Sequence, residues 1–105
     1  EGLTLPFLDQ TETEPVYHIF PTMLPDGMDR MKVIEILKRE GVQSSIHYPM
    51  MQDFSAFKGF QLDETPIARE ISRRELTLPL YPTMTEDDVD IVISAFRIAL
   101  QEARK

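Results

Sequence analysis

The chain of 105 residues has no cysteine, no tryptophan, only four glycines and no long apolar run. Without cysteine it cannot form a disulfide, supply a thiol nucleophile or build a cysteine-based zinc site. That absence is typical of a reducing compartment, and we expect the cytoplasm. No apolar stretch approaches the roughly 20 residues that span a bilayer, and no charged-then-apolar leader stands at the start. We therefore expect no membrane partner.

Basic residues are also scarce. The chain carries 11 basic and 18 acidic residues, for a net charge of -7. Phosphate contacts need clustered lysine and arginine, so this balance disfavours binding to nucleic acid or to an anionic membrane. The densest acidic group, at residues 86–90, has the pattern of a helix start rather than of a metal site.

Motifs that carry chemistry by themselves are missing too. The sequence has no glycine-rich phosphate loop, no HExxH and no Gly-x-Ser-x-Gly. Two histidines without cysteine give no spacing for a metal site. A Schiff-base lysine needs desolvation or a cationic neighbour. Lys32, Lys38 and Lys105 have polar settings. Lys58 follows Phe57 in a loop, and none of the four lysines shows either condition. We therefore predict no catalytic residue, no cofactor-binding residue and no metal ligand in this chain.

The first half of the chain predicts a lead-in, a strand and a helix. Residues 1–15 hold two prolines and an acidic run, which indicates a linker whose apolar members pack on something. Residues 16–20 are β-branched and aromatic between Pro15 and Pro21, so we predict a strand. A helix is predicted over residues 28–40, with Asp26 or Asp29 as N-cap and Gly41 just beyond its end.

Residues 41–49 alternate with a period of two, which predicts a second strand. Val42, Ser44, Ile46 and Tyr48 would share one face, and His47 would lie on the other. Pro49 ends the strand and leaves His47 at its carboxyl end, where a loop can place it in a cleft. From the pattern alone, a structural histidine is a commoner outcome than a functional one.

The second half predicts a loop, two helices and a third strand. Phe54, Phe57 and Phe60 recur every three residues and favour a short helical turn that covers the core or walls a pocket. Thr65 and Pro66 start a helix that runs to about residue 74. This helix would bury Ile67, Ala68 and Ile71. Residues 76–82 alternate like a strand that Pro79 confines to an edge or cuts short.

The last helix begins with a capping box at Thr85. Its predicted buried face consists of Val89, Val92, Ile93, Phe96, Leu100 and Ala103. Ile91 and Ile98 would lie on another side, where a partner surface could cover them. The predicted order is β-α-β-α-β-α. We therefore predict an α+β two-layer sandwich, with a small three-stranded sheet and helices on one face.

Two motifs carry a resemblance to a known family. The first is Gly41-Val42-Gln43-Ser44-Ser45-Ile46-His47-Tyr48-Pro49, and the second is Leu76-Thr77-Leu78-Pro79-Leu80-Tyr81-Pro82 with the following Thr85-Glu86-Asp87-Asp88-Val89. Together they resemble the C-terminal small domain of the DegT/DnrJ/EryC1/StrS aminotransferases, over residues from about 3 to 103. The resemblance divides the chain into a lead-in, residues 1–15, from a missing N-terminal domain, and the small domain itself, residues 16–105.

The resemblance implies a fragment of a PLP-dependent enzyme that aminates a keto group on a nucleotide-activated sugar, with glutamate or glutamine as donor. PLP, the Schiff-base lysine and the phosphate-binding groups would belong to the larger N-terminal domain. That domain would be the fragment's partner, and the parent enzyme would be a homodimer. The fragment alone would be inactive and would contribute a cleft wall.

The resemblance also selects candidate substrate-binding residues. His47 and Tyr48 match the family's His-Tyr-Pro, which implies His47 as a substrate-facing polar group and Tyr48 as a wall or structural support. Arg30 matches a frequent family arginine, and at the exposed start of a helix its alternative role is to anchor the domain. The chain departs from the family just after this motif, where Met50, Met51 and Gln52 replace the usual Pro-x-His. Gln52 can form hydrogen bonds but cannot act as an acid or a base.

A second hypothesis remains open from the sequence. The same layout would suit a stand-alone ligand-binding or regulatory module without catalysis. A fragment should expose an apolar patch from Ile91, Ile98 and residues 3–8, whereas a module should have a polar surface.

Overall fold

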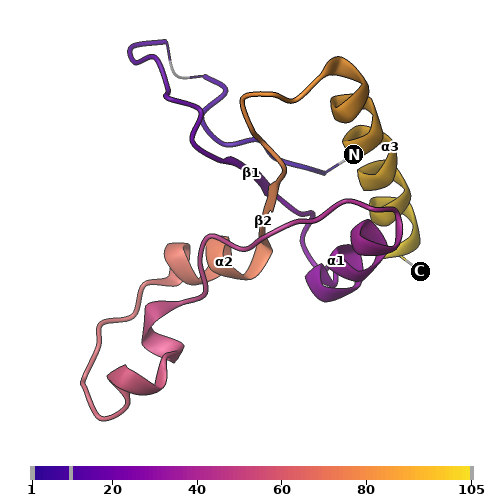
Figure 1. Cartoon of the computed structure of the whole chain (residues 1–105). Helices are drawn as coiled ribbons and strands as arrows, with labels where there is room; N and C mark the ends of the chain where they lie inside the picture. Colours follow the sequence, from indigo (N-terminus) through magenta and orange to yellow (C-terminus); the bar gives the residue numbers. More distant parts are fainter. Residues whose placement is uncertain (1, 10, 105) are drawn as a thin grey trace.

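Two short antiparallel strands lie at the centre of the molecule (Figure 1). The computed structural model describes residues 2–9 and 11–104, so Lys105 lies outside the described residues. Strand β1 (Phe20–Met23) pairs with β2 (Glu75–Leu78), with Phe20 opposite Leu78 and Met23 opposite Glu75. The other elements are α1 (Arg30–Arg39), α2 (Pro66–Arg74), α3 (Glu86–Glu102) and the 3-10 turns η1 (Met51–Asp53) and η2 (Ser55–Phe57).

The boundaries of α1 follow from its capping residues. The Asp29 carboxylate accepts the backbone N–H groups of Met31 (2.9 Å) and Lys32 (3.2 Å), so of the two predicted N-caps this one is used. At the other end Gly41 has φ +81°, a left-handed conformation that costs glycine little. The N–H of Val42 then donates to the carbonyl of Leu37 (2.8 Å) and closes the helix.

Helix α3 has the predicted capping box. Thr85 Oγ1 accepts the N–H of Asp88 (3.2 Å), and the Asp88 carboxylate accepts the N–H of Thr85 (2.9 Å). At the far end of α3, Arg39 of α1 forms a two-pronged ion pair with Glu102, with both N–O distances 3.0 Å. This exposed ion pair links α1 to the end of α3.

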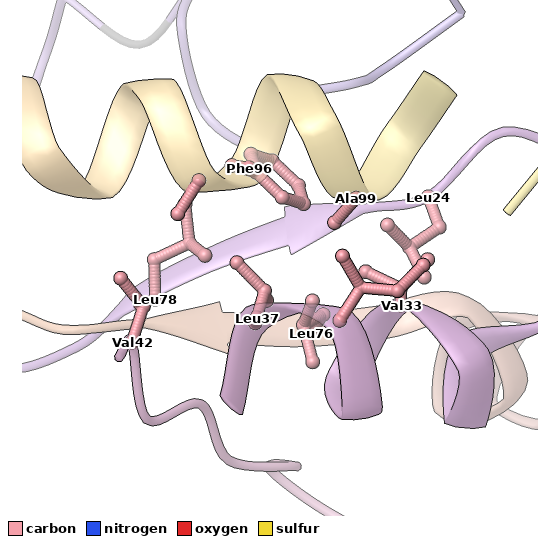
Figure 2. Packing of buried hydrophobic residues seen from close by; sticks show 10 residues of the cluster. Leu24, Val33, Leu37, Val42, Leu76, Leu78, Phe96 and Ala99 are labelled. Carbon is pink, nitrogen blue, oxygen red and sulfur yellow. The ribbon is translucent and has the colours of Figure 1, made fainter. Parts of the chain in front are cut away.

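The core lies between α1, α3 and one face of the two strands (Figure 2). Leu76 and Leu78 of β2 point into it, as do Val33 and Leu37 of α1 and Phe96 of α3. The remaining buried members of this cluster are Leu24, Ile36, Val42, Ala95 and Ala99. Within the described residues, no helix is both long and apolar enough to cross a membrane. The result is an α+β unit in which α1 and α3 form the helical layer.

The predicted three-stranded sheet is wrong, because residues 41–49 contribute only one bridge, between Ser45 and Thr77. Their backbones exchange hydrogen bonds of 3.1 and 2.9 Å. The next pair of an antiparallel ladder would be His47 with Glu75. The His47 N–H instead donates to the Glu75 side chain (2.8 Å), and the Glu75 carbonyl accepts from Arg30 (3.1 Å). Because the His47 N–H and the Glu75 carbonyl are both bonded to side chains, the ladder stops after one bridge. The order of helices and strands is therefore β-α-α-β-α.

The first strand also lies later than predicted. It begins at Phe20 rather than at Val16 and continues through Pro21, which was expected to bound it. Strand β2 has four residues and pairs with no more than four, so the chain before Phe20 has no strand partner there. Val16 is accordingly 90% exposed. Strand β2 ends at Leu78, directly before Pro79. This confirms the expectation that Pro79 cuts the strand short.

Helix α2 has the predicted bounds but not the predicted burial. Ile67 is 77% exposed, and Ala68 and Ile71 are exposed as well. Figure 1 shows the reason: α2 and the 3-10 turns extend away from the layer of α1 and α3, so neither of those helices covers them. The expectation that all helices lie on one face of the sheet is therefore wrong for α2.

The predicted buried face of α3 is correct in part. Phe96 is buried, and Val92, Leu100 and Ala103 pack against the core, but Val89 and Ile93 are exposed. Ala95 and Ala99 are buried in the core instead. Ile91 is exposed as expected, whereas Ile98 packs against the core.

Candidate functional site

The segment after α1 passes beside β2 on its way to α2 (Figure 1). His47 belongs to this segment, two residues after the Ser45–Thr77 bridge. Its backbone N–H donates to Glu75 Oε2 (2.8 Å), and its ring Nδ1 is 2.9 Å from Thr77 Oγ1. The ring also meets the Tyr48 ring edge to face, with centroids 4.8 Å apart. The imidazole is half-buried, so one side is held by the protein and another side is accessible.

A first hollow of about 670 Å³, called here the strand pocket, opens on one side of His47. It is bounded by residues 41–45, by the chain from Thr77 to Tyr81 and by the first turns of α3. Asp88 lies at its edge, and the backbone N–H of Thr85 holds the pKa of that carboxyl below its usual value. Ser44 Oγ is buried and has no hydrogen-bond partner among the described residues. The walls of this pocket are polar and apolar in equal measure.

A second hollow of about 540 Å³, called here the loop pocket, opens on the other side. Residues 48–52, Phe57, Leu62 and the inner side of α2 line it, and its walls are mostly apolar. His47 lines both pockets and is the residue that they share. A ligand that extends from one pocket into the other would therefore pass the imidazole.

The structure brings three of the four predicted site residues together. His47, Tyr48 and Gln52 all line the loop pocket. The Gln52 amide donates to Thr65 Oγ1 (2.9 Å), and Thr65 lines the same pocket. Tyr48 is 69% exposed, so its ring is available to a ligand or to a covering surface. The sequence left open whether the segment with Phe54, Phe57 and Phe60 covers the core or forms a pocket wall. Phe57 lines the loop pocket, so this segment forms part of its wall.

Arg30 lies outside both pockets. Its Nη1 donates to the backbone carbonyls of Ser72 and Glu75, where α2 ends and β2 begins. Ser72 in turn donates from Oγ to the Tyr48 carbonyl (2.8 Å). Arg30 therefore supports the loop pocket from behind, and a direct contact between Arg30 and substrate stays a prediction.

Sequence reasoning missed Glu75 and Thr77, which hold His47. Both are buried, with 3% and 5% of their surface exposed. Thr77 Oγ1 donates to Glu75 Oε1 (2.5 Å), so the two side chains and the imidazole form one network. The available signal was the alternation of residues 75–78, which sets Glu75 and Thr77 on the face opposite Leu76 and Leu78. A buried carboxylate on a strand favours a specific partner.

Among residues 2–9 and 11–104, no group of three or more histidine, aspartate or glutamate side chains is close enough to hold a metal ion. The site can bind and orient a ligand through His47, Gln52 and the apolar walls.

Comparison with known proteins finds a family whose model matches the sequence of this chain. A model of the DegT/DnrJ/EryC1/StrS aminotransferase family matches residues 1–97. The chain is 30% identical to dTDP-4-amino-4,6-dideoxy-D-glucose transaminase of Escherichia coli, over 84% of this chain and 25% of that protein. More widely, it spans about a quarter of the length of the curated relatives that it matches.

Solved structures share the fold. The aminotransferase TlmJ from Streptoalloteichus hindustanus superposes with a TM-score of 0.86 at 22% identity, over 100% of this chain and 28% of that one. The PLP-form of the putative sugar aminotransferase Spr1654 from Streptococcus pneumoniae superposes with a TM-score of 0.82 at 26% identity, over 97% of this chain and 27% of that one.

Proposed function

Because the chain belongs to the DegT/DnrJ/EryC1/StrS aminotransferase family, we propose that it forms the small C-terminal domain of a PLP-dependent sugar aminotransferase. The whole enzyme transfers an amino group from glutamate or glutamine to a keto group of a nucleotide-activated sugar. The observation that carries this proposal is the family match over residues 1–97 in a chain that spans 25% of its E. coli relative. That relative is named as a transaminase of a dTDP-linked sugar.

The described residues of this chain do not form a binding site for PLP. PLP supplies an electron sink once a lysine or an amino substrate is bound to it. Lys38 and Lys58 are exposed, Lys32 is half-buried on α1, and none of the three lines the strand pocket or the loop pocket. The proposal therefore assigns the coenzyme and its lysine to a larger N-terminal domain, and no catalytic residue to the described chain.

This chain supplies one wall of the substrate cleft. His47, Tyr48 and Gln52 present an imidazole, a phenol and an amide around the loop pocket, beside apolar side chains. Such a mixture suits a ligand that combines a flat, apolar part with hydroxyl groups. A nucleotide-activated sugar has both. The wall orients this substrate and excludes water from one side of the cleft.

The exposed apolar side chains support a large partner domain. Phe7 and Leu8 of the lead-in, Ile67 of α2 and Ile91 of α3 are all largely exposed. A larger domain of the same polypeptide would cover such side chains, and the parent enzyme would pair as a homodimer. Residues 3–8 contribute to this surface only in part, because Leu3 packs against the core.

The test uses the full-length protein that carries this chain. Purified with PLP and given glutamate and a dTDP-linked 4-keto sugar, it should form an amino sugar and 2-oxoglutarate. Replacement His47→Ala should lower kcat/KM about tenfold or more while the melting temperature changes little, because one ligand hydrogen bond is lost.

His18→Ala is the matched control. His18 is exposed and lines neither pocket, so this variant should keep the wild-type rate. Absence of any amino transfer with keto-sugar nucleotides would overturn the proposed function. Wild-type kinetics in His47→Ala would remove His47 from the substrate site.

A further inference from the structure

The His47 imidazole is held through a buried chain of hydrogen bonds. Thr77 Oγ1 is 2.9 Å from His47 Nδ1 and donates to Glu75 Oε1 over 2.5 Å. Glu75 Oε2 accepts the backbone N–H of His47 (2.8 Å). Both carboxylate oxygens of Glu75 are therefore occupied, one by the side chain that contacts the imidazole and one by the histidine's own backbone.

The number of protons available in this series of hydrogen bonds determines which ring nitrogen of His47 is protonated. A hydroxyl has one proton to donate. With Glu75 ionised, its carboxylate can only accept, so the proton of Thr77 goes to Glu75. Thr77 Oγ1 can then only accept from the His47 ring. In the neutral imidazole the proton must therefore be on Nδ1, and Nε2 carries a lone pair.

Nε2 has no hydrogen-bond partner within residues 2–9 and 11–104. The imidazole borders both the strand pocket and the loop pocket, so this nitrogen is the part of His47 left for a ligand. A lone pair can accept a hydrogen bond but cannot donate one. The complementary ligand group is a hydroxyl, of which a sugar carries several.

We propose that Glu75 and Thr77 are positioning residues that hold His47 as its Nδ1–H tautomer, so that Nε2 accepts a hydrogen bond from a substrate hydroxyl. That the hydroxyl belongs to a sugar rests on the proposed function. The hydrogen bonds among His47, Thr77 and Glu75 are independent of the proposed function. A substrate that has lost this hydroxyl would leave Nε2 unpaired and would bind less well.

The tautomer is measured by ¹⁵N NMR of the full-length protein labelled with ¹⁵N-histidine. The His47 signals are assigned by their loss in His47→Ala. We expect a protonated, pyrrole-type Nδ1 and an unprotonated, pyridine-type Nε2 at a pH where the imidazole is neutral. An Nε2–H tautomer, or an even mixture, would overturn the proposal, and this wild-type measurement decides it whether or not any variant folds.

Three variants separate positioning from simple structural support. Thr77→Val removes the hydroxyl at nearly constant volume and should convert His47 to a tautomer mixture, whereas Thr77→Ser should retain the Nδ1–H form. Thr22→Val is the matched control, because Thr22 is also buried in this sheet and donates to Leu76 O (2.7 Å) without touching His47. Its His47 signals should match the wild type. Unchanged signals in a folded Thr77→Val would contradict the proposed role of Thr77.

Kinetics with the dTDP-linked keto sugar test the ligand half of the proposal. Thr77→Val should lower kcat/KM about tenfold, the loss expected from one misdirected hydrogen bond, and Thr77→Ser should restore it. A changed tautomer with unchanged kcat/KM would overturn the role of Nε2 in binding. A wild-type protein that shows the Nδ1–H tautomer but transfers no amino group would overturn the proposed function and leave the positioning network in place.

Discussion

Arg30 has the anchoring role that the sequence left open for it beside the predicted substrate contact. Its Nη1 donates to the carbonyls of Ser72 and Glu75, which lie next to the loop pocket and the His47 network. Sequence spacing placed Arg30 at a helix start but gave no information about a partner more than 40 residues away. The position of His47 beside a pocket, by contrast, could be predicted from the sequence, because Pro49 marked the end of an extended segment. Its choice as a substrate-binding residue came from the family resemblance and stays a prediction.

Replacing Arg30 with methionine tests this structural role. Arg30→Met should lower the free energy of unfolding by about 2 kcal/mol, because two partly buried carbonyls lose a charged donor. Urea unfolding measures the change. The control is Arg69→Met, because the Arg69–Asp53 ion pair (3.3 Å) is exposed and such pairs contribute about 0–1 kcal/mol. Equal effects of the two substitutions would refute the anchoring role.

Ser44 supplies a prediction of the opposite sign. Its Oγ is buried and has no partner among the described residues. Burial of an unpaired hydroxyl is unfavourable, so Ser44→Ala should raise the free energy of unfolding of the chain by about 1 kcal/mol. Ser45→Ala, at an exposed neighbouring position, should change it by less than about 0.5 kcal/mol. Loss of stability in Ser44→Ala would mean that the hydroxyl has a partner in solution.

At the scale of elements, helices were predicted better than strands. Capping chemistry is local: Asp29, Gly41, Thr85 and Pro66 fix helix ends within a few residues of the bounds expected. A strand depends on a distant partner. Residues 41–49 have the alternation of a strand, yet one bridge forms, because the Glu75 side chain takes the His47 N–H. The pattern of residues 41–49 alone could not predict that a side chain would replace a backbone carbonyl as the partner of the His47 N–H.

The cap of α3 gives a stability prediction. Thr85→Ala removes the hydroxyl that accepts the Asp88 N–H, and N-cap losses of this kind cost about 1 kcal/mol. Thr85→Ser keeps the hydroxyl and should stay near the wild type. Both are measured by urea unfolding at neutral pH. A stable Thr85→Ala would show that packing against α1 determines where α3 begins.

The same cap predicts a dependence on pH. The backbone N–H and the hydroxyl of Thr85 donate to the Asp88 carboxylate and hold its pKa below the usual value. A carboxyl whose folded pKa is depressed stabilises the fold above its unfolded pKa, and this contribution is lost as pH falls. The stability difference between wild type and Asp88→Asn should therefore be full at neutral pH and shrink below about pH 4. A difference that stays constant with pH would contradict this role.

At the scale of the whole molecule, the α+β class could be predicted, but the arrangement of α2 could not. The apolar side of α2 was assigned to the core, yet Ile67 and Ile71 are exposed and α2 stands apart from α1 and α3 (Figure 1). An apolar stripe predicts that a helix face is covered without saying what covers it. Under the proposed function, a larger domain of the same polypeptide would cover that stripe.

The most direct test of this account locates the coenzyme in the full-length protein. Reduction of the PLP-loaded protein with borohydride fixes the coenzyme to its lysine, and peptide mass spectrometry identifies that lysine. We predict a single pyridoxyl-lysine outside these 105 residues, because the described lysines lie outside both pockets. A pyridoxyl group on Lys32, Lys38, Lys58 or Lys105 would contradict the account.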